Sequence, residues 1–509
     1  MSNHSYLLSK SGFVSGVQCE KKFYFDRYRK DLKPALSVQQ ESLFEKGNLI
    51  GDFAKTLFDG GVDLGVTDRF DSAEQAKRTQ ALLKQSVNTI YEAAFYVKGV
   101  FAALDILHHQ DGQCWAIEVK SSSSVKDYHL TDASLQYWVM TESGLKPDKF
   151  FLMHVNSEYV KQGPIIPDDF FTLVDITDQI INNQEWVAEQ LKFLIEINDN
   201  RHEPAKEIGK HCSNPFDCDY KGHCWSHVPE ENSVFELTNA RGREWDLYAR
   251  GILHLHEVPD NELNLTTRQQ LQIDGVKYGK TIIDKFSIDE FVRSVSYPIY
   301  YFDFETINSA IPILHNTSPF QQVPFQYSLH IAESHSGPVS HKEFLAIAKD
   351  FVEDSPQDPR KTLINQLKAD IGPDGSIMAY NATFEKNVIK ALAEAFPEDA
   401  EFLLSLLPRF VDLLDVFKAG WYYTPSMKGS ASIKYVLPAL FPDLSYQNLE
   451  IGNGEQASTV FLEMITGQFK GNEIEMRDHL LAYCKQDTFA MVLLYNELEK
   501  ISDSLGHQD

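Results

Sequence analysis

The run Ile299-Tyr300-Tyr301-Phe302-Asp303-Phe304-Glu305-Thr306 is apolar and aromatic except for two carboxylates and a terminal threonine. This composition predicts a buried β-strand, on which residues two apart point to the same face of the sheet. Asp303 and Glu305 then repel each other and lose hydration, unless a cation lies between them. The other interpretation is a strand end at which both acids meet solvent. The acidic segments farther along the chain favour the cation.

Two later segments carry acids in a defined order. GSIMAYNATFEK predicts a strand, a turn at Asn381 and a helix with Glu385 in its first turn. A strongly periodic helix near the C-terminus then carries Tyr483 and Asp487, which are four apart and so share one helix face. Four carboxylates from such segments hold two divalent ions, and a tyrosine beside them orients the attacking water. Asp412, in the stretch VDLLD, is the alternative fourth ligand.

This trio resembles the DnaQ-like exonucleases of the DEDDy type, which have an RNase H-like fold. The resemblance covers residues 296–502 and implies a 3′–5′ exonuclease that uses Mg²⁺ or Mn²⁺. Glu385 stands where that superfamily usually has aspartate. On this basis the metal ligands and the water-orienting residue are Asp303, Glu305, Glu385, Asp487 and Tyr483.

A second acidic pattern lies in the N-terminal part of the chain. VFAALDILHHQDGQCWAIEVK predicts a hairpin that turns at Asp111-Gly112. Asp105 lies on its first strand, and Glu118 and Lys120 share a face of the second. An aspartate beside Glu-x-Lys on adjacent strands is typical of a metal-dependent phosphodiesterase, in which the lysine orients water and offsets phosphate charge. A surface salt bridge is the plainer interpretation of the same pattern.

Three of the six cysteines are clustered. Cys212, Cys218 and Cys224 follow one another at six-residue spacing, and Cys19 is the candidate for a fourth ligand. Disulfides are the uncommon use of cysteines in a cytosolic chain, and no C-x2-C pair is present among these four. The thiols therefore predict a [4Fe–4S] cluster, with a zinc ion or free thiols as the alternatives.

Residues 1–227 resemble the RecB-family nucleases, in particular the CRISPR-associated RecB-like exonucleases with an iron–sulfur staple. The resemblance implies a PD-(D/E)XK, restriction-endonuclease-like domain. This chain departs from the family pattern, because its early stretch GNLIGDF has no metal-binding histidine. The implied active site is Glu92, Asp105, Glu118 and Lys120, with Gln136 on the following helix as a supporting residue and Cys19, Cys212, Cys218 and Cys224 as cluster ligands.

The expected fold class is α/β, and the length of the chain allows two or three domains. The 509 residues carry a net charge of −26, which argues against broad, non-specific coating of nucleic acid or of an anionic membrane. Residues 1–30 have no signal-peptide pattern and no apolar run is long enough to span a bilayer, so we expect a cytoplasmic protein without membrane contact. The expected domains are 1–227 (RecB-like nuclease), 228–295 (a small helical connector), 296–502 (RNase H-like exonuclease) and 503–509 (a flexible tail).

These patterns predict a divalent-metal-dependent nuclease that acts on DNA, in repair or in defence against foreign DNA. The basic and aromatic stretch around Lys21–Lys33 is where we expect DNA to bind. Two alternatives stay open. One is a nucleic-acid-binding scaffold whose N-terminal domain has lost catalysis, and the other is an exonuclease that trims RNA with its C-terminal domain.

Overall fold

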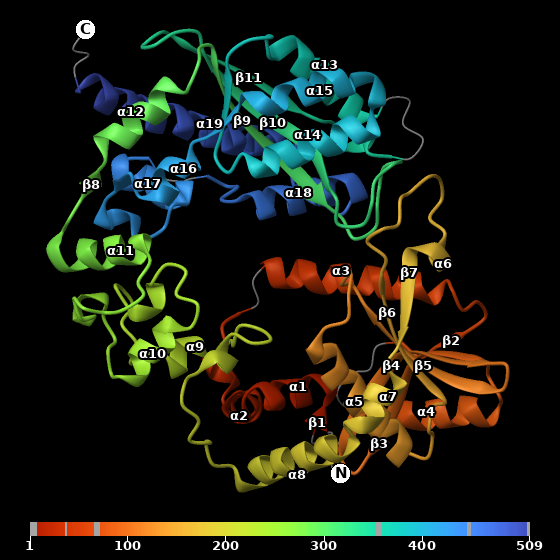
Figure 1. Ribbon diagram of the computed structural model, residues 1–509. Helices are drawn as coiled ribbons and strands as arrows, with labels where there is room; N and C mark the ends of the chain where they lie inside the picture. The colour runs from red at the N-terminus through yellow and green to blue at the C-terminus, as the bar shows by residue number, and fades with distance from the viewer. Residues whose placement is uncertain (1–7, 36–37, 66–71, 353–357, 445–448, 506–509) are drawn as a thin grey trace. The chain divides into compact units, whose positions relative to one another are not determined.

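The computed structural model describes residues 8–35, 38–65, 72–352, 358–444 and 449–505, without the side chains of 38–46. The chain divides into two compact units, Met1–His227 and Val228–Asp509, and both mix helices with strands (Figure 1). The expected connector, 228–295, belongs to the second unit. The expected tail starts at the last residue of a helix, Asp503, and its residues 506–509 lie outside the described ranges.

Within the described residues, the first unit contains a seven-stranded sheet in the order β2-β3-β4-β5-β6-β7, with β1 paired to β4. The predicted hairpin is confirmed, since β4 and β5 pair antiparallel. Asp111 and Gly112 form its turn with φ of 53° and 78°, the left-handed conformation that a two-residue hairpin turn requires. The strands are β1 (Leu8–Ser9), β2 (Val62–Asp63), β3 (Thr89–Val97), β4 (Val100–Gln110), β5 (Gln113–Lys120), β6 (Lys149–Val155) and β7 (Phe171–Asp175).

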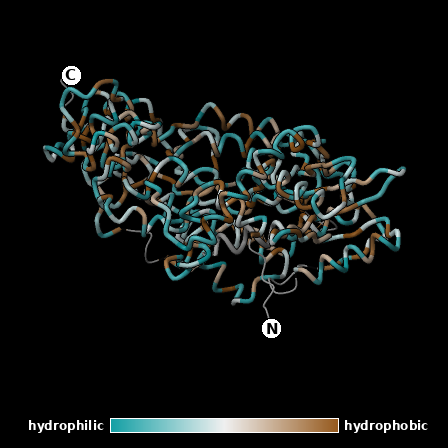
Figure 2. Tube along the Cα trace, turned by 90° about the horizontal axis from the view of Figure 1, so that it is seen from below, coloured by the Kyte–Doolittle hydropathy of each residue, from teal (hydrophilic) through white to brown (hydrophobic). Residues whose placement is uncertain are grey.

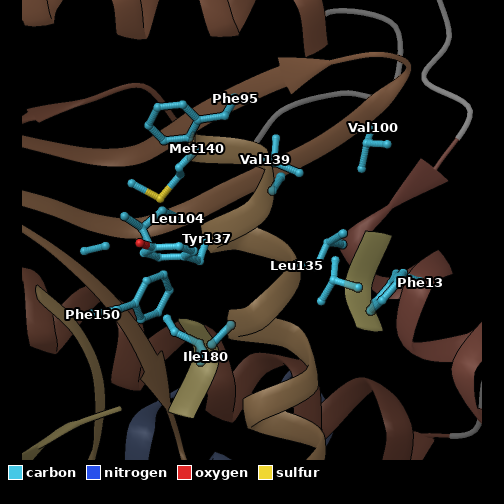
Figure 3. Close-up of a cluster of buried hydrophobic side chains, with 14 of the residues drawn as sticks. Phe13, Phe95, Val100, Leu104, Leu135, Tyr137, Val139, Met140, Phe150 and Ile180 are labelled. Carbon is cyan, nitrogen blue, oxygen red and sulfur yellow. The ribbon is translucent and has the colours of Figure 1, made fainter. Parts of the chain in front are cut away.

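One helix, α5 (Asp127–Glu142), lies in the middle of this unit. Its residues Leu135, Tyr137, Val139 and Met140 are buried on several sides of the helix, and Figure 3 shows them among side chains of the sheet and of α1. A helix that is buried on several sides cannot rotate, so the polar residues it carries are held in fixed positions. The other helices of the unit are α1 (Lys10–Gln18), α2 (Glu20–Tyr28), α3 (Val38–Lys55), α4 (Ser72–Lys84), α6 (Pro167–Phe170), α7 (Thr177–Asn182), α8 (Gln184–Asn200) and α9 (Lys221–Cys224).

The second unit contains, in its described part, a five-stranded sheet in the order β11-β10-β9-β12-β13. Strand β9 carries the DxE pair, runs antiparallel to β10 and parallel to β12. A separate ribbon joins β8 (Ile282–Ile283) to β14 (Tyr422–Tyr423). The strands of the main sheet are β9 (Ile299–Asn308), β10 (Gln322–Ala332), β11 (Val339–Leu345), β12 (Ser376–Ala379) and β13 (Phe410–Asp412).

The two faces of β9 differ in what covers them. Tyr300, Phe302 and Phe304 pack into a core with residues of α13, α14 and α15, whereas Tyr301 packs on the other face with residues of α19. Asp303 and Glu305 lie on the face of Tyr301, because side chains alternate along a strand. The helices are α10 (Arg243–Ala249), α11 (Thr267–Tyr278), α12 (Lys285–Arg293), α13 (Pro359–Asp370), α14 (Thr383–Ala395), α15 (Ala400–Leu406), α16 (Leu414–Ala419), α17 (Ile433–Leu440), α18 (Gly454–Thr466) and α19 (Glu473–Asp503).

Hydrophobic and hydrophilic residues alternate in short stretches along the trace (Figure 2). Among the described helices, none combines the length and the apolar character that crossing a lipid bilayer requires.

Candidate active sites

The second unit brings the predicted acids of β9 and α19 together. Helix α19 packs across β9 and β10, so its inner face meets the face of β9 that carries Asp303 and Glu305. The thiol of Cys484 donates to Asp303 Oδ2 over 3.5 Å. The ligand atoms of Asp303, Glu305 and Cys484 all lie within 4.8 Å of one another. Tyr483 is buried beside them, and the charge of Asp487 acts on Asp303 and Glu305.

Glu385 completes this group, which we call the acidic centre (Asp303, Glu305, Glu385 and Asp487). It lies in the first turn of α14 with 2% of its surface exposed. Its Oε2 atom is buried and has no hydrogen-bond partner. The helix begins just after Asn381, whose φ of 76° is the left-handed conformation that asparagine tolerates.

Asp412, the alternative fourth ligand, has another role in the structure. Its Oδ1 accepts the backbone N–H groups of Asn381 and Leu414, and its Oδ2 accepts that of Ala382. Both oxygens therefore hold the turn that precedes α14. Because Glu385 keeps an oxygen without a partner, the geometry favours Glu385 over Asp412 as a metal ligand.

The buried carboxylates of the acidic centre disfavour one another's charged forms. Burial raises the pKa of Asp303 well above its ordinary value, and the charge of Asp487 adds to this effect. Burial, reinforced by Asp303, does the same to the pKa values of Glu305 and Glu385. Oxygen-rich, buried and mutually repelling carboxylates fit a divalent ion such as Mg²⁺ or Mn²⁺.

Three residues of this site were not predicted from the sequence. Gly454, the first residue of α18, lies so close to Glu305 that a β-carbon there would be 3.2 Å from Glu305 Oε2. Lys434 donates to the carbonyl of Gly452 over 3.0 Å, lies 6.0 Å from the ring of Tyr483, and lowers the pKa of Glu305 against the effect of burial. Cys484 lies between the predicted residues Tyr483 and Asp487 of α19. It is three residues before Asp487 and so shares its helix face, which could have indicated its place in the site.

The first unit assembles a different site, which we call the lysine-rich site (Lys10, Glu118, Lys120 and Asp132). Glu118 Oε1 accepts from Lys10 Nζ and from Lys120 Nζ, both at 2.7 Å. Lys120 also donates to Asp132 Oδ2 at 2.7 Å. Gln136 donates to Glu118 Oε2 at 2.6 Å, so both oxygens of this buried carboxylate are engaged. Lys10 was not predicted, because the sequence alone does not bring the start of α1 to β5.

Asp105 lies at the point where β4 and β5 stop pairing. The register of the two strands ends at Ile106 opposite Ile117, and Asp105 Oδ2 accepts the backbone N–H of Val119 at 2.6 Å. Burial and the charge of Glu118 raise the pKa of Asp105 to about 7. Burial alone would raise the pKa of Glu118 too, but Lys10 and Lys120 outweigh burial and hold it well below its ordinary range.

Glu92, the remaining acid of the implied active site, has an unusual backbone conformation. It lies inside β3 with φ of 54°. A positive φ within a strand is strained for glutamate and turns its side chain out of the regular alternation. Lys55, at the end of α3, lies 3.8 Å from Glu92 Oε1, while burial raises the pKa of Glu92.

The four predicted cluster cysteines line one pocket. Buried Gln18 anchors the late cysteine segment, since its Nε2 donates to the carbonyls of His211 at 2.8 Å and Phe216 at 2.6 Å. The thiol pKa of Cys224 rises to about 11 through burial, against the effect of Lys21 and reinforced by the neighbouring thiols. The structure thus brings the early cysteine and the three late ones to one place in the first unit.

Comparisons with known proteins match parts of this chain. Residues 300–432 match the family described as a domain of unknown function, DUF2779. The chain is 30% identical over 218 residues to the uncharacterized protein MG366 of Mycoplasma genitalium, covering 40% of this chain and 32% of that one. It is 30% identical over 239 residues to the uncharacterized protein UU173 of Ureaplasma parvum, covering 43% and 33% respectively. The chain thus spans about a third of the length of these curated relatives.

One solved structure, described as the crystal structure of SSO0001, aligns with 43% of this chain and 86% of its own. The two share 14% sequence identity, and the TM-score is 0.23.

Proposed function

We propose that this chain is a divalent-metal-dependent nuclease whose acidic centre hydrolyses DNA from the 3′ end. The observation that carries the proposal is the convergence of Asp303, Glu305 and Glu385 in a buried place where Glu385 Oε2 has no hydrogen-bond partner. Burying unpaired carboxylates is unfavourable. Divalent cations bound between these carboxylates would offset the cost of burying them.

The strand arrangement supports the proposed folds. In the second unit, a mixed sheet carries its acids on the strand that lies in its centre, with a long C-terminal helix across that face. This agrees with the expected RNase H-like exonuclease. In the first unit, Asp105 and Glu118-x-Lys120 lie on adjacent strands, which agrees with the expected PD-(D/E)XK domain.

The residues of the acidic centre have distinct parts in hydrolysis. Asp303, Glu305, Glu385 and Asp487 would hold the ions. Burial, with the neighbouring carboxylates, raises the pKa of Tyr483 far above its ordinary value, so its hydroxyl keeps its proton and can donate to, and orient, the attacking water. When bound, the two Mg²⁺ or Mn²⁺ ions supply an activated water and stabilise the leaving 3′ oxygen.

The test is a cleavage assay on anaerobically purified protein. End-labelled single-stranded DNA, duplex DNA and RNA are incubated with Mn²⁺ or Mg²⁺, using wild type, Asp303→Asn and the surface control Glu394→Gln. We expect stepwise shortening from the 3′ end of DNA, lost in Asp303→Asn and kept in the control. Shortening of RNA alone would transfer the proposal to RNA trimming. Equal activity in Asp303→Asn would contradict the assignment of the site.

The lysine-rich site is the basis for a second proposed nuclease function, in the first unit, which has less support than the first. Its acids, Glu118 and Asp132, are already compensated by Lys10 and Lys120. These ion pairs favour the other alternative for the first unit, a nucleic-acid-binding scaffold. Phosphate groups of a nucleic acid can replace the carboxylates as partners of the two lysines. An Asp303→Asn background isolates this site. Residual cleavage that Lys120→Met removes supports catalysis, whereas DNA binding without cleavage supports the scaffold.

We propose further that Cys19, Cys212, Cys218 and Cys224 hold a [4Fe–4S] cluster. All four line one pocket, and Lys21, Lys22 and Lys221 line it with them. Iron and acid-labile sulfide analysis tests this directly. We expect Gln18→Leu, which removes the hydrogen bonds to the carbonyls of His211 and Phe216, to lose cluster faster to a chelator than the surface control Gln113→Leu. A colourless protein with one zinc per chain would contradict the proposal.

A further inference from the structure

Cys484 brings a sulfur atom into the acidic centre. It is fully buried on α19, and its Sγ lies 3.5 Å from Asp303 Oδ2 and 3.9 Å from the carbonyl oxygen of Asp303. Its sulfur and one carboxylate oxygen each of Asp303 and Glu305 lie within 4.8 Å of one another. Hydrolysis as proposed above uses the carboxylates and Tyr483 and leaves this thiol without a role.

The spacing of these atoms suits a small tetrahedral ion. With Zn–S of about 2.3 Å and Zn–O of about 2.1 Å, the sulfur–oxygen edge of a tetrahedron is about 3.6 Å. The observed separation between Cys484 Sγ and Asp303 Oδ2 is 3.5 Å. A further carboxylate lies near these atoms. The buried Oε2 of Glu385 has no hydrogen-bond partner, and the carboxyl interacts electrostatically with Asp303 and Glu305.

Sulfur changes which ions the site prefers. Mg²⁺ binds oxygen ligands and does not favour thiolate, whereas zinc and its heavier analogue cadmium bind sulfur strongly. An acidic centre made of carboxylates alone would not discriminate in this way. The thiol of Cys484 therefore gives the centre a preference that its carboxylates do not explain.

We propose that Asp303, Glu305 and Cys484 form a binding site for a thiophilic divalent ion of the zinc class, and that this ion blocks the acidic centre by taking the carboxylates that hydrolysis needs. On binding, the Cys484 sulfur forms a bond to the ion and its proton leaves to solvent. The blocking part rests on the proposed nuclease function, whereas the binding part does not.

Cadmium-113 NMR of the intact wild-type protein, with its cysteine cluster in place, tests the binding part. The chemical shift separates a mixed oxygen–sulfur site from an all-sulfur site, so cadmium at the four clustered cysteines would give its own signal. We expect one mixed-site signal in wild type. It should be lost in Cys484→Ser and Cys484→Ala and kept in Cys114→Ser, which changes a buried thiol of the first unit. A wild-type spectrum without a mixed-site signal, or a signal that survives in both Cys484 variants, overturns the proposal.

Equilibrium dialysis supplies a second readout. Losing a direct ligand should weaken zinc binding at this site by about 100-fold or more, while Mn²⁺ affinity changes by less than about 3-fold. Equal weakening of zinc and Mn²⁺ overturns the proposal, because it would show a general loss of the site's shape. If cleavage fails in every substrate but the mixed-site signal is present, the nuclease function fails and the zinc-class site stands. If zinc inhibits cleavage by wild type no more strongly than cleavage by Cys484→Ser, the blocking part is overturned.

Discussion

Gly454 lies against the carboxylate of Glu305, so that a β-carbon at position 454 would be 3.2 Å from Glu305 Oε2. The chain separates these residues by almost 150 positions, and it is the start of α18 that covers the acidic centre. A side chain at this position would displace the carboxylate of Glu305 by a few tenths of an ångström. Glycine leaves the carboxylate in its place.

Gly454→Ala should lower metal-dependent cleavage by about 10-fold, because displacing a metal ligand by a few tenths of an ångström disturbs the alignment on which hydrolysis depends. Its stability should be unchanged or slightly higher, since alanine favours a helix more than glycine does. Cleavage rates and urea unfolding check both statements. Gly452→Ala is the matched control, because a β-carbon at Gly452 would lie at an ordinary 3.9 Å from Gln456 Oε1. Equal loss in both variants would contradict the steric explanation.

Glu385→Gln should stabilise the metal-free protein by about 1–2 kcal/mol at pH 8 and stop cleavage. Burial and Asp303 raise the pKa of Glu385, so the folded state resists its ionisation. This cost appears above the ordinary pKa of the unfolded chain and grows as the pH rises towards the raised folded value. The gain should therefore be smaller at pH 5 than at pH 8.

Urea unfolding in EDTA at both pH values measures this difference. Glu394→Gln, an exposed residue on the same helix, should change stability at neither pH. Added Mn²⁺ should stabilise wild type more than Glu385→Gln. Destabilisation by Glu385→Gln without metal would show that the carboxylate is satisfied within the protein.

Lys10→Met should reduce cleavage by the lysine-rich site by about 10-fold or more in an Asp303→Asn background. Lys10 Nζ lies 2.7 Å from Glu118 Oε1 and 3.7 Å from Asp132 Oδ2, so its loss leaves Glu118 with a single ammonium partner. Lys77→Met, at an exposed position on α4, is the control. Unchanged cleavage in Lys10→Met would show that Lys10 serves structure alone, and a scaffold would show weaker DNA binding instead.

The stability of the second unit should fall in mild acid because of His330 and His341. Burial lowers the pKa of each to about 4, and Lys485 acts on both in the same direction. Below the ordinary value of about 6.5, the unfolded chain binds protons that the folded state refuses, so stability is lost as the pH falls from 6.5 towards 4. Each histidine should contribute about 2 kcal/mol to the loss between pH 7 and pH 5.

His330→Asn should remove about half of this loss while keeping a hydrogen-bonding side chain near Thr488, whose Oγ1 lies 2.8 Å from His330 Nδ1. Urea unfolding at pH 7 and pH 5 measures the loss of stability in wild type and in His330→Asn. The raised pKa values of the acidic centre change stability in the opposite direction, but they do so equally in both proteins, so the difference between the two reports the histidine. His202→Asn, at an exposed position, should leave the difference unchanged. An identical pH response in His330→Asn and wild type would contradict the prediction.

Local patterns predicted the secondary elements that carry the acids. The hairpin at Asp111-Gly112, the β9 strand, the strand, turn and helix around Asn381, and the final helix are all present. Each depends on a short-range signal, either a turn residue with positive φ or a regular alternation of apolar residues. The positive φ of Glu92 inside β3 has no such local signal.

The sequence by itself determined which residues are the candidates for chemistry: the acids of β9 and α19, the Glu-x-Lys of β5 and the four cysteines. Residue type and short spacing are enough for that, because chemical identity is local. The tertiary structure decided what surrounds them. Lys10 reaches Glu118 over 108 positions, and Gly454, at the start of α18, lies against Glu305. Such neighbours follow from packing between distant segments, which no short pattern contains. Packing also makes the two sites electrostatically different: lysines neutralise Glu118 and Asp132 of the first, whereas the buried acids of the second repel one another.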